Sequence, residues 1–254
     1  MIGAFQPAGE GEADEILVGF VFGFPGFDTT PDGPRPKHCS HMLAVHPDFR
    51  NRGLGFALKR AQWQMVRHQG LDHISWTYDP LLSRNAHLNI TKLGAVCNTY
   101  RREVYGEMRD SLNAGLPSDR FEVDWWINTQ RVNRRLSRRA RLRLDLAHFL
   151  AAGAEIVNPT WLDDRGYPHP ADQTMNPVDV EKLAVNSPLV LVEIPDDFQT
   201  LRGNDIELAL QWRLSTRSLF ESLFASGYLV TDFVYLAGQH PRSYYVLSHG
   251  DSTL

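Results

Sequence analysis

The chain has 254 residues, of which 43% are hydrophobic and 22% are charged, and its formal net charge is −4. This composition is typical of a globular protein with a sizeable core, and it excludes a disordered or fibrous chain. The longest apolar run, residues 16–27, is interrupted by Gly19, Gly23 and Pro25, so we expect no membrane-spanning helix. Two cysteines and the lack of a signal-peptide pattern predict a cytoplasmic protein.

The first half of the chain alternates between strand and helix patterns. β-branched and aromatic residues predict strands at residues 16–24, 38–45, 73–78, 95–105 and 121–127. Apolar residues at helical spacing predict a helix over 54–69, and a shorter helix over 83–93 begins at Ser83 as its N-cap. Prolines and glycines over 26–36 predict a loop. The alternation predicts an α/β layer fold.

The second half begins with an amphipathic helix over residues 131–150 and a long proline-rich loop over 158–177. The elements predicted after it are a strand at 189–194, a helix at 205–225, and strands at 228–236 and 243–247. This order repeats that of residues 73–127, which suggests a half-repeat. We expect three parts: a domain over 1–128, a helical connector over 129–185, and a smaller C-terminal α/β unit over 186–254.

Residues 45–58 (VHPDFRNRGLGFAL) carry the most informative pattern, because a strand ends there, a polar turn follows and a helix begins. The unpaired N–H groups of a helix N-terminus bind phosphate, and Gly53 and Gly55 keep side chains away from that backbone. Arg50 and Arg52 add positive charge. The pattern lacks the third glycine of a dinucleotide fingerprint and the Gly-Lys-Ser/Thr of a P-loop. A plain glycine turn with solvated arginines is the alternative.

This turn resembles the most diagnostic motif of the GNAT acetyltransferase superfamily, a Val-x-Pro strand end followed by Arg/Gln-x-x-Gly-x-Gly/Ala. The motif stands here as Val45-His46-Pro47 and Arg50-Asn51-Arg52-Gly53-Leu54-Gly55. A second match, residues 85–95 (NAHLNITKLGA), is similar to the family's asparagine-containing helix that ends in Leu-Gly. The resemblance covers about residues 1–128. It implies a GNAT-like mixed sheet with flanking helices.

The resemblance further implies an acyl-CoA-dependent N-acyltransferase that uses acetyl-CoA and a small amine or amino-acid-like acceptor. The strand edge near Val45 would pair with the pantetheine arm, and the strand at 73–78 would splay away to admit it. An N–H of the strand that contains Leu43 and Val45 would hold the oxyanion. The cofactor-binding residues implied in this way are Leu43, Ala44, Val45, Arg50, Asn51, Arg52, Gly53, Leu54, Gly55, Phe56, Ala57, Asn85 and Asn89.

A general base must take the proton of the attacking amine. His41 is the first candidate, since it lies within a few residues of the expected thioester, and a hydrogen-bonded strand histidine is the alternative role. Glu103 is the second candidate, and Asp79 and Glu107 are further ones. A turn aspartate and solvated strand carboxylates are the alternatives for these acids.

A general acid is the other expected catalytic group. In many family members a tyrosine one turn before the Leu-Gly protonates the leaving thiolate, but Ile90 stands at that position here. Tyr105 is our candidate to replace it, with Tyr78, Tyr100 or solvent as alternatives. The family usually opens with a strand and two helices that shape the acceptor site, but only fifteen residues precede the strand at 16–24. We therefore expect a domain that is short at its N-terminus: either the chain starts late, or its C-terminal half builds the acceptor wall.

Other ligands are disfavoured. The histidines and Cys39 within residues 38–46 alternate between strand faces, so only pairs converge and we expect no metal. Seven arginines over residues 131–143 could bind nucleic acid, but we favour a packed amphipathic helix with a solvated basic face in an otherwise acidic chain. The main alternative to an enzyme is a non-catalytic acyl-CoA-binding or interaction protein with a degenerate site. A homodimer is an open alternative to a monomer.

Overall fold

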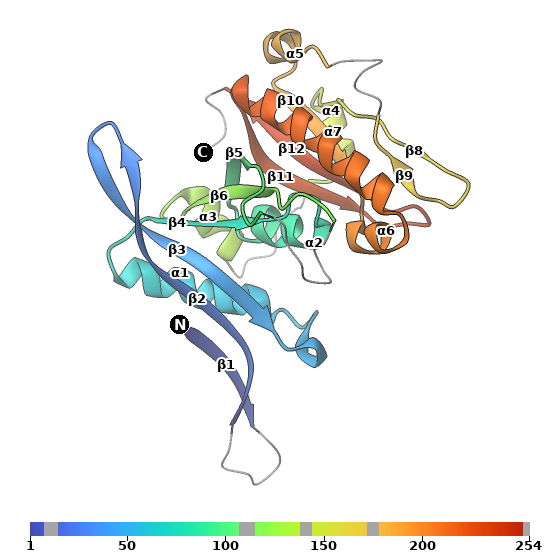
Figure 1. Cartoon of the computed structure of the whole chain (residues 1–254). Coiled ribbons are helices and arrows are strands. Elements are labelled where there is room, and N and C mark those ends of the chain that lie inside the picture. The colour runs from blue at the N-terminus through green and yellow to red at the C-terminus, as the bar shows by residue number, and fades with distance from the viewer. Residues whose placement is uncertain (8–14, 107–114, 138–143, 172–177, 251–254) are drawn as a thin grey trace. The chain divides into compact units, whose positions relative to one another are not determined.

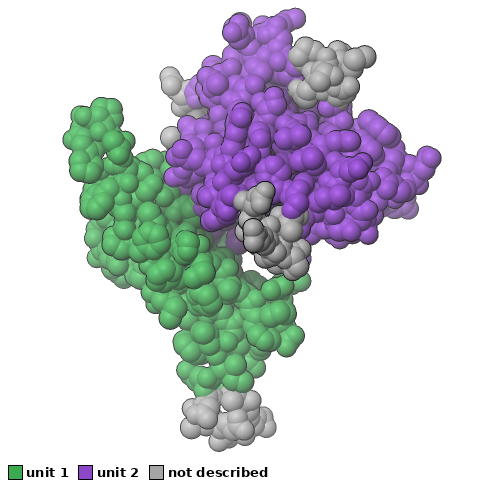
Figure 2. All heavy atoms as spheres, in the orientation of Figure 1, with its two compact units in different colours: residues 1–76, 124–137 green, residues 77–123, 138–254 purple. Residues whose placement is uncertain are grey.

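The computed structural model describes residues 1–7, 15–106, 115–137, 144–171 and 178–250. The chain divides into two compact units (Figure 2): unit 1 comprises residues 1–76 and 124–137, and unit 2 comprises residues 77–123 and 138–254. Strands β4 (His73–Tyr78) and β6 (Arg120–Trp126) have residues in both units. The three segments expected from the sequence divide the chain at other points and stay a prediction.

Unit 1 contains a mixed sheet with the strand order β1-β2-β3-β4. Its strands are β1 (Ile2–Pro7), β2 (Glu15–Thr30), β3 (Gly33–Val45) and residues 73–76 of β4. The first three are antiparallel neighbours, and β4 runs parallel to β3. One face of β1, β2 and β3 packs against α1 (Leu54–His68), as Figure 1 shows, and this helix has the predicted position.

The loop expected over residues 26–36 is wrong, because β2 and β3 continue as a long hairpin whose last register pair is Thr30 and Gly33. Gly33 has a φ of 109°, which allows a tight turn. Pro34 and Pro36 occupy alternate register positions of β3, opposite Thr29 and residue 27. β3 pairs with β4 only further along the chain. The two prolines therefore lie at positions where the sheet needs no N–H donor from β3, and their lack of an N–H costs no hydrogen bond.

The single helix expected over residues 131–150 is also wrong for the described part of that range. α3 (Gln130–Leu136) starts at the N-cap Thr129 and ends at Ser137, which is extended with a ψ of 151°. A second helix, α4 (Leu146–Ala151), starts at Asp145, whose side chain accepts a hydrogen bond from the N–H of His148. Four of the seven arginines, at positions 138, 139, 141 and 143, lie outside the described residues.

Unit 2 is a second α/β layer with the strand order β5-β11-β12-β10-β7. These strands are β5 (Val96–Arg101), β11 (Tyr228–Leu236), β12 (Arg242–His249), β10 (Leu189–Ile194) and β7 (Glu155–Ile156). The helices of this unit outside α4 are α2 (Ser83–Ala86), the π-helix η2 (His87–Lys92), α5 (Val180–Asn186), α6 (Phe198–Asn204) and α7 (Ile206–Ala225). The predicted bounds of β10 and β11 are confirmed.

Aromatic side chains hold the layers of unit 2 together. Phe121 meets Phe220 of α7 edge-on at 4.8 Å between ring centroids and Tyr245 of β12 at 5.4 Å, and all three are fully buried. Such edge-to-face pairs add stability beyond the area that they bury. Asp205 is the N-cap of α7, and its side chain accepts a hydrogen bond from Leu208 N–H at 2.9 Å.

Two smaller expectations about unit 2 need correction. Leu82, not Ser83, is the N-cap of α2, and the predicted helix over 83–93 continues as η2 because its hydrogen bonds widen to the π pattern. The loop expected over 158–177 contains a short hairpin of β8 (Trp161–Leu162) and β9 (Pro168–His169). None of the helices in the described ranges is long and apolar enough to cross a membrane.

Lys59 of α1 is buried in unit 1 with 2% of its surface exposed. Its Nζ donates to Ser40 Oγ at 2.7 Å and to Gln62 Oε1 at 3.3 Å, and it lies 3.6 Å from the ring centroid of Trp76. No carboxylate of the described chain pairs with it. Burial therefore lowers the pKa of Lys59 well below its ordinary value.

We expect Lys59→Met to raise the free energy of unfolding at neutral pH by about 1–3 kcal/mol, because methionine fills the space without a buried charge. The folded-state pKa of Lys59 is lowered, so the unfolded chain binds more protons and the wild type gains stability as pH rises toward about 10.4. Urea unfolding should show that the difference in free energy of unfolding between Lys59→Met and the wild type shrinks as the pH rises. Exposed Lys182→Met is the control, and a pH-independent difference would contradict the prediction.

Candidate functional site

The turn after β3 places a helix N-terminus at an exposed surface of unit 1. A single 3-10 turn, η1 (Pro47–Phe49), follows the strand, and Asn51 and Gly53 then adopt left-handed φ angles of 63° and 82°. Gly53 is the N-cap of α1 and offers no side chain to cap it. A glycine is needed there because other residues rarely adopt this conformation.

The backbone of this turn has the properties of an anion site. Ala57 N–H donates to Gly53 O at 3.0 Å, the first bond of the helix, so the N–H groups of residues 54–56 have no partner in the helix ladder. The first turn of this 15-residue helix holds no acidic residue. Its dipole and its free N–H donors together favour a bound phosphate.

The two arginines of the turn have different roles. Arg50 Nε donates to Val45 O at 3.2 Å, which ties the turn to the end of the strand. Arg52 lies with its guanidinium 5.1 Å from the ring centroid of Phe49, and both arginines are exposed. Arg50 therefore braces the backbone, whereas Arg52 presents its charge beside the helix start.

The strand before the turn has an open edge and a bulge. β3 pairs with β4 only through His38–Ile74 and Cys39–Ser75, so residues 40–45, which include Leu43, Ala44 and Val45, have no register partner on that side. On the other side, Phe22 opposes Met42 and Gly23 opposes Ser40, which leaves His41 as the extra residue of a β-bulge. A bulge frees its extra residue from the ladder and redirects its side chain.

His41 is exposed in unit 1 and lies among aromatic rings. Its ring centroid is 6.3 Å from that of Phe22 and 5.8 Å from that of Phe24. His41 thus lies on the strand that carries the open edge, four residues before the strand ends at Val45. The bulge was not predicted, because register depends on the partner strand.

The remaining predicted site residues belong to unit 2. Asn85 is half-buried on α2, and Asn89 is 5% exposed on η2, where its C=O accepts a hydrogen bond from Ala95 N–H. The structure therefore divides the predicted cofactor residues between the two units.

Glu103 and Tyr105 lie in an exposed turn, because the strand expected to reach residue 105 ends at Arg101. Glu103 has a left-handed φ of 49°. Its N–H donates to Asp119 Oδ1 at 3.1 Å and so makes no hydrogen bond between strands. Tyr105 is 51% exposed, and its hydroxyl lies 3.5 Å from Thr77 Oγ1. Glu107 lies outside the described residues.

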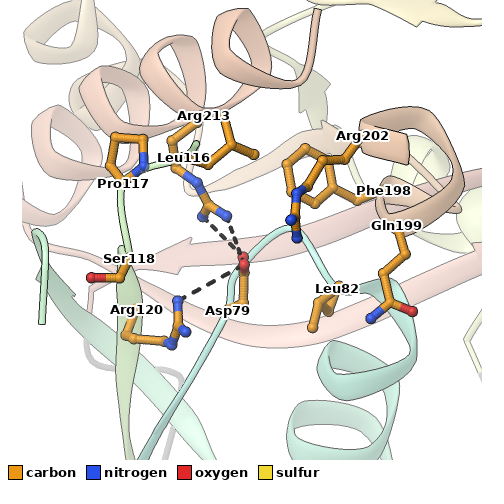
Figure 3. A pocket seen from close by; sticks show the side chains of 10 residues that line it. All are labelled: Asp79, Leu82, Leu116, Pro117, Ser118, Arg120, Phe198, Gln199, Arg202 and Arg213. Atoms are coloured by element: carbon orange, nitrogen blue, oxygen red, sulfur yellow. Dashed lines mark hydrogen bonds and ion pairs between the residues drawn. The ribbon is translucent and has the colours of Figure 1, made fainter. Parts of the chain in front are cut away.

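The alternative acids and bases have fixed partners. Tyr78 is buried with its hydroxyl 3.1 Å from that of Tyr245, and burial raises its pKa well above the ordinary value. Tyr100 donates to Asp119 Oδ2 at 2.9 Å, and its pKa is also raised by burial. The carboxylate of Asp79 accepts hydrogen bonds from both terminal nitrogens of Arg213 (Figure 3). These contacts favour structural roles for the three residues.

The histidines and the cysteine of β3 do not gather into a metal site. His38 is 4% exposed, and its Nε2 lies 3.1 Å from Nε2 of Gln62. In the ranges that the structure describes, no three His, Cys, Asp or Glu side chains converge as potential ligands.

The mixed sheet, the open strand edge and the uncapped helix start form a candidate anion site in an α/β fold, and sequence comparison gives a related family. Residues 5–94 match the model of the acetyltransferase (GNAT) family. This segment, which begins within β1 and ends after η2, is therefore similar to the GNAT acetyltransferases. A search of curated proteins returns no significant match.

Solved GNAT structures align with the chain at low similarity. Ard1 from Thermoplasma volcanium is 19% identical with a TM-score of 0.33, over 42% of this chain and 62% of its own length. Naa20 from Chaetomium thermophilum, solved with a bisubstrate analogue, is 15% identical with a TM-score of 0.37, over 53% and 70%. The ribosomal-protein-S18-alanine N-acetyltransferase from Escherichia coli is 17% identical with a TM-score of 0.34, over 50% and 68%.

Proposed function

We propose that this protein is an acyl-CoA-dependent N-acyltransferase that transfers acetyl from acetyl-CoA to a small amine or amino-acid-like acceptor. One observation carries the proposal: the left-handed Gly53 starts a helix with free N–H donors directly after a strand whose outer edge is open. A pyrophosphate against that helix and an extended pantetheine arm along that edge use both features. The match of residues 5–94 to the GNAT acetyltransferase model supports the same reading.

The chemistry is a direct attack of the amine nitrogen on the thioester carbonyl. A carbon–nitrogen bond forms, the carbon–sulfur bond breaks, and the thiolate of CoA leaves with a proton. A backbone N–H of the bulged part of β3 would stabilise the oxyanion, since a bulge leaves donors outside the ladder. His41, which is the bulged residue, would take the proton of the amine.

Thermal unfolding with and without acetyl-CoA tests the cofactor. At about 100 times its dissociation constant a ligand adds about 2.7 kcal/mol of stability. For a chain of this length we therefore expect the midpoint to rise by about 5–10 °C. No rise at any concentration would contradict the proposal.

We expect His41→Ala to lower kcat by about 100-fold or more while the dissociation constant of acetyl-CoA stays unchanged, because a general base acts on the amine and not on the cofactor. Steady-state kinetics and calorimetry measure the two quantities. His68→Gln, at the exposed end of α1, is the matched control. A kcat of His41→Ala within about threefold of the wild type would show that His41 is a structural residue of β3 and not the general base.

A non-catalytic acyl-CoA-binding protein is the second candidate. The observation in its favour is Ile90, which is fully buried at the position where many relatives carry the thiolate-protonating tyrosine. Tyr105 is our proposed replacement, on the strength of its exposure. Turnover with a panel of amines separates the two functions. The cytoplasmic location, the oligomeric state and nucleic-acid binding through residues 131–143 stay predictions.

A further inference from the structure

A buried network of polar side chains lies directly before the bulge of β3. His38 and Ser40 come from β3, and Lys59 and Gln62 come from α1. All four belong to unit 1, and each is between 0% and 6% exposed. α1 packs along this strand, as Figure 1 shows. The network therefore joins the helix to the strand that carries the candidate general base.

Ser40 is the link between the helix and the strand. Lys59 Nζ donates to Ser40 Oγ at 2.7 Å, and Ser40 Oγ donates to Gln62 Oε1 at 2.9 Å. The amide nitrogen of Gln62 lies 3.1 Å from Nε2 of His38, to which it donates. Two side chains of β3 are thus held by two side chains of α1, with Ser40 bonded to both of them.

The bulge shifts the pattern of burial along β3 by one residue. Before it, the buried residues have even numbers, and Ser40 is the last of them. After it, the half-buried residues are Leu43 and Val45, and between the two stretches His41 and Met42 are both exposed. Side chains of a regular strand alternate between its two faces, so two exposed neighbours mark the position of the extra residue.

The hydrogen bond from Lys59 to Ser40 resists loss of this bulge. A slip of one residue would move Ser40 to the outer face of the sheet and leave the buried Nζ of Lys59 without its closest partner. Gly23 opposes Ser40 on β2, and an added Cβ at Gly23 would lie 2.7 Å from the carbonyl oxygen of Cys39. The two strands therefore approach closely here, which a glycine permits.

Lys59 is a costly residue for this contact. Its amine is buried without a carboxylate partner among the described residues, and the contact of Nζ with the ring of Trp76 at 3.6 Å offsets only part of that cost. A side chain that lowers stability is expected where function requires it. The function nearest to Lys59 is that of His41, which follows its partner Ser40 in the chain.

We infer that Lys59 is a positioning residue: through Ser40 it fixes the bulge that presents His41 and frees a backbone N–H for the oxyanion. The catalytic part of this inference rests on the proposed function. The structural part does not, because the hydrogen bond and the bulge are present without a substrate. Since Lys59 is buried, it acts on the reaction only through the strand.

Amide hydrogen exchange of residues 38–45, followed by mass spectrometry, tests the structural part without any need for activity. We expect exchange in this segment to be about tenfold faster in Lys59→Met than in the wild type, although the variant is the more stable protein, because the opening is local. Exposed Lys182→Met should exchange like the wild type. If Lys59→Met does not fold, Ser40→Ala replaces it. Unchanged exchange in the folded variant would overturn the inference.

Steady-state kinetics and calorimetry test the catalytic part. We expect Lys59→Met and Ser40→Ala each to lower kcat by about tenfold while the dissociation constant of acetyl-CoA stays unchanged, since a small displacement of a base is enough for such a loss. The double variant should lose no more than either single one, because both remove the same hydrogen bond. Additive losses, or a kcat within about twofold of the wild type, would overturn the inference. Absence of turnover in the wild type would instead overturn the proposed function, and hydrogen exchange then decides whether Lys59 fixes the bulge.

Discussion

Replacement of Gly55 by glutamate is expected to abolish acetyl-CoA binding while the fold is kept or strengthened. Gly55 lies in the first turn of α1 and is not among the residues with positive φ, so its backbone accepts a side chain. Glutamate has a higher helix propensity than glycine and interacts favourably with the helix N-terminus. The same carboxylate would occupy the phosphate position and repel the pyrophosphate. We expect the dissociation constant to rise by about 100-fold or more.

Calorimetric titration with acetyl-CoA and thermal unfolding of the free variant measure the two halves of this result. Gly238→Glu is the matched control, because its added side chain meets open space and its φ is ordinary. Unchanged acetyl-CoA affinity in Gly55→Glu would remove the cofactor site from this turn. Loss of affinity together with a lowered midpoint would point to unfolding and not to the phosphate site.

Replacement of Arg213 by methionine is expected to lower the free energy of unfolding by about 3–5 kcal/mol. The Asp79 side chain is only 12% exposed and loses both of its guanidinium hydrogen bonds, so a carboxylate is left in a poorly solvated place. Urea unfolding measures the loss. A second change, Asp79→Leu, should recover most of it, since the unpaired charge is then gone.

Arg101→Met provides the comparison for Arg213→Met. Arg101 pairs with Glu122 at 2.8 Å, but its side chain is 58% exposed, and an exposed pair is worth about 0–1 kcal/mol. The two variants make the same chemical change at a buried and at an exposed ion pair. Equal effects would show that Asp79 stays solvated and that the pair does not hold unit 2 together.

The elements that could be predicted from the sequence have strong local signals. β-branched runs bounded by turn residues define β4, β10 and β11, and apolar spacing defines α1. The hairpin over residues 26–36 was missed because its prolines fall at register positions that need no N–H, and a sequence does not show register. The helix over residues 131–150 was wrong because Asp145 starts a new helix within an unbroken apolar pattern.

In the candidate site, as in the fold, the parts with a local sequence signal could be predicted and those that depend on strand register could not. The glycine turn is contiguous in sequence, so the strand end, the turn and the helix start could be predicted from the motif alone, and cofactor binding by residues 50–57 stays a prediction. The bulge at His41 depends on the register against β2, and no local pattern encodes it. The contact between Asp79 and Arg213 joins positions separated by 134 residues, and neither residue stands out in its own segment.

Acetyl transfer by the intact chain tests the central claim most directly. The protein is incubated with acetyl-CoA and a panel of amino acids, polyamines and short peptides, while released CoA thiol is followed and products are identified by mass spectrometry. We predict CoA release that requires an amine, yields its N-acetyl product and is lost in Gly55→Glu. Binding of acetyl-CoA without amine-dependent release for any member of the panel would contradict the enzyme and favour an acyl-CoA-binding protein.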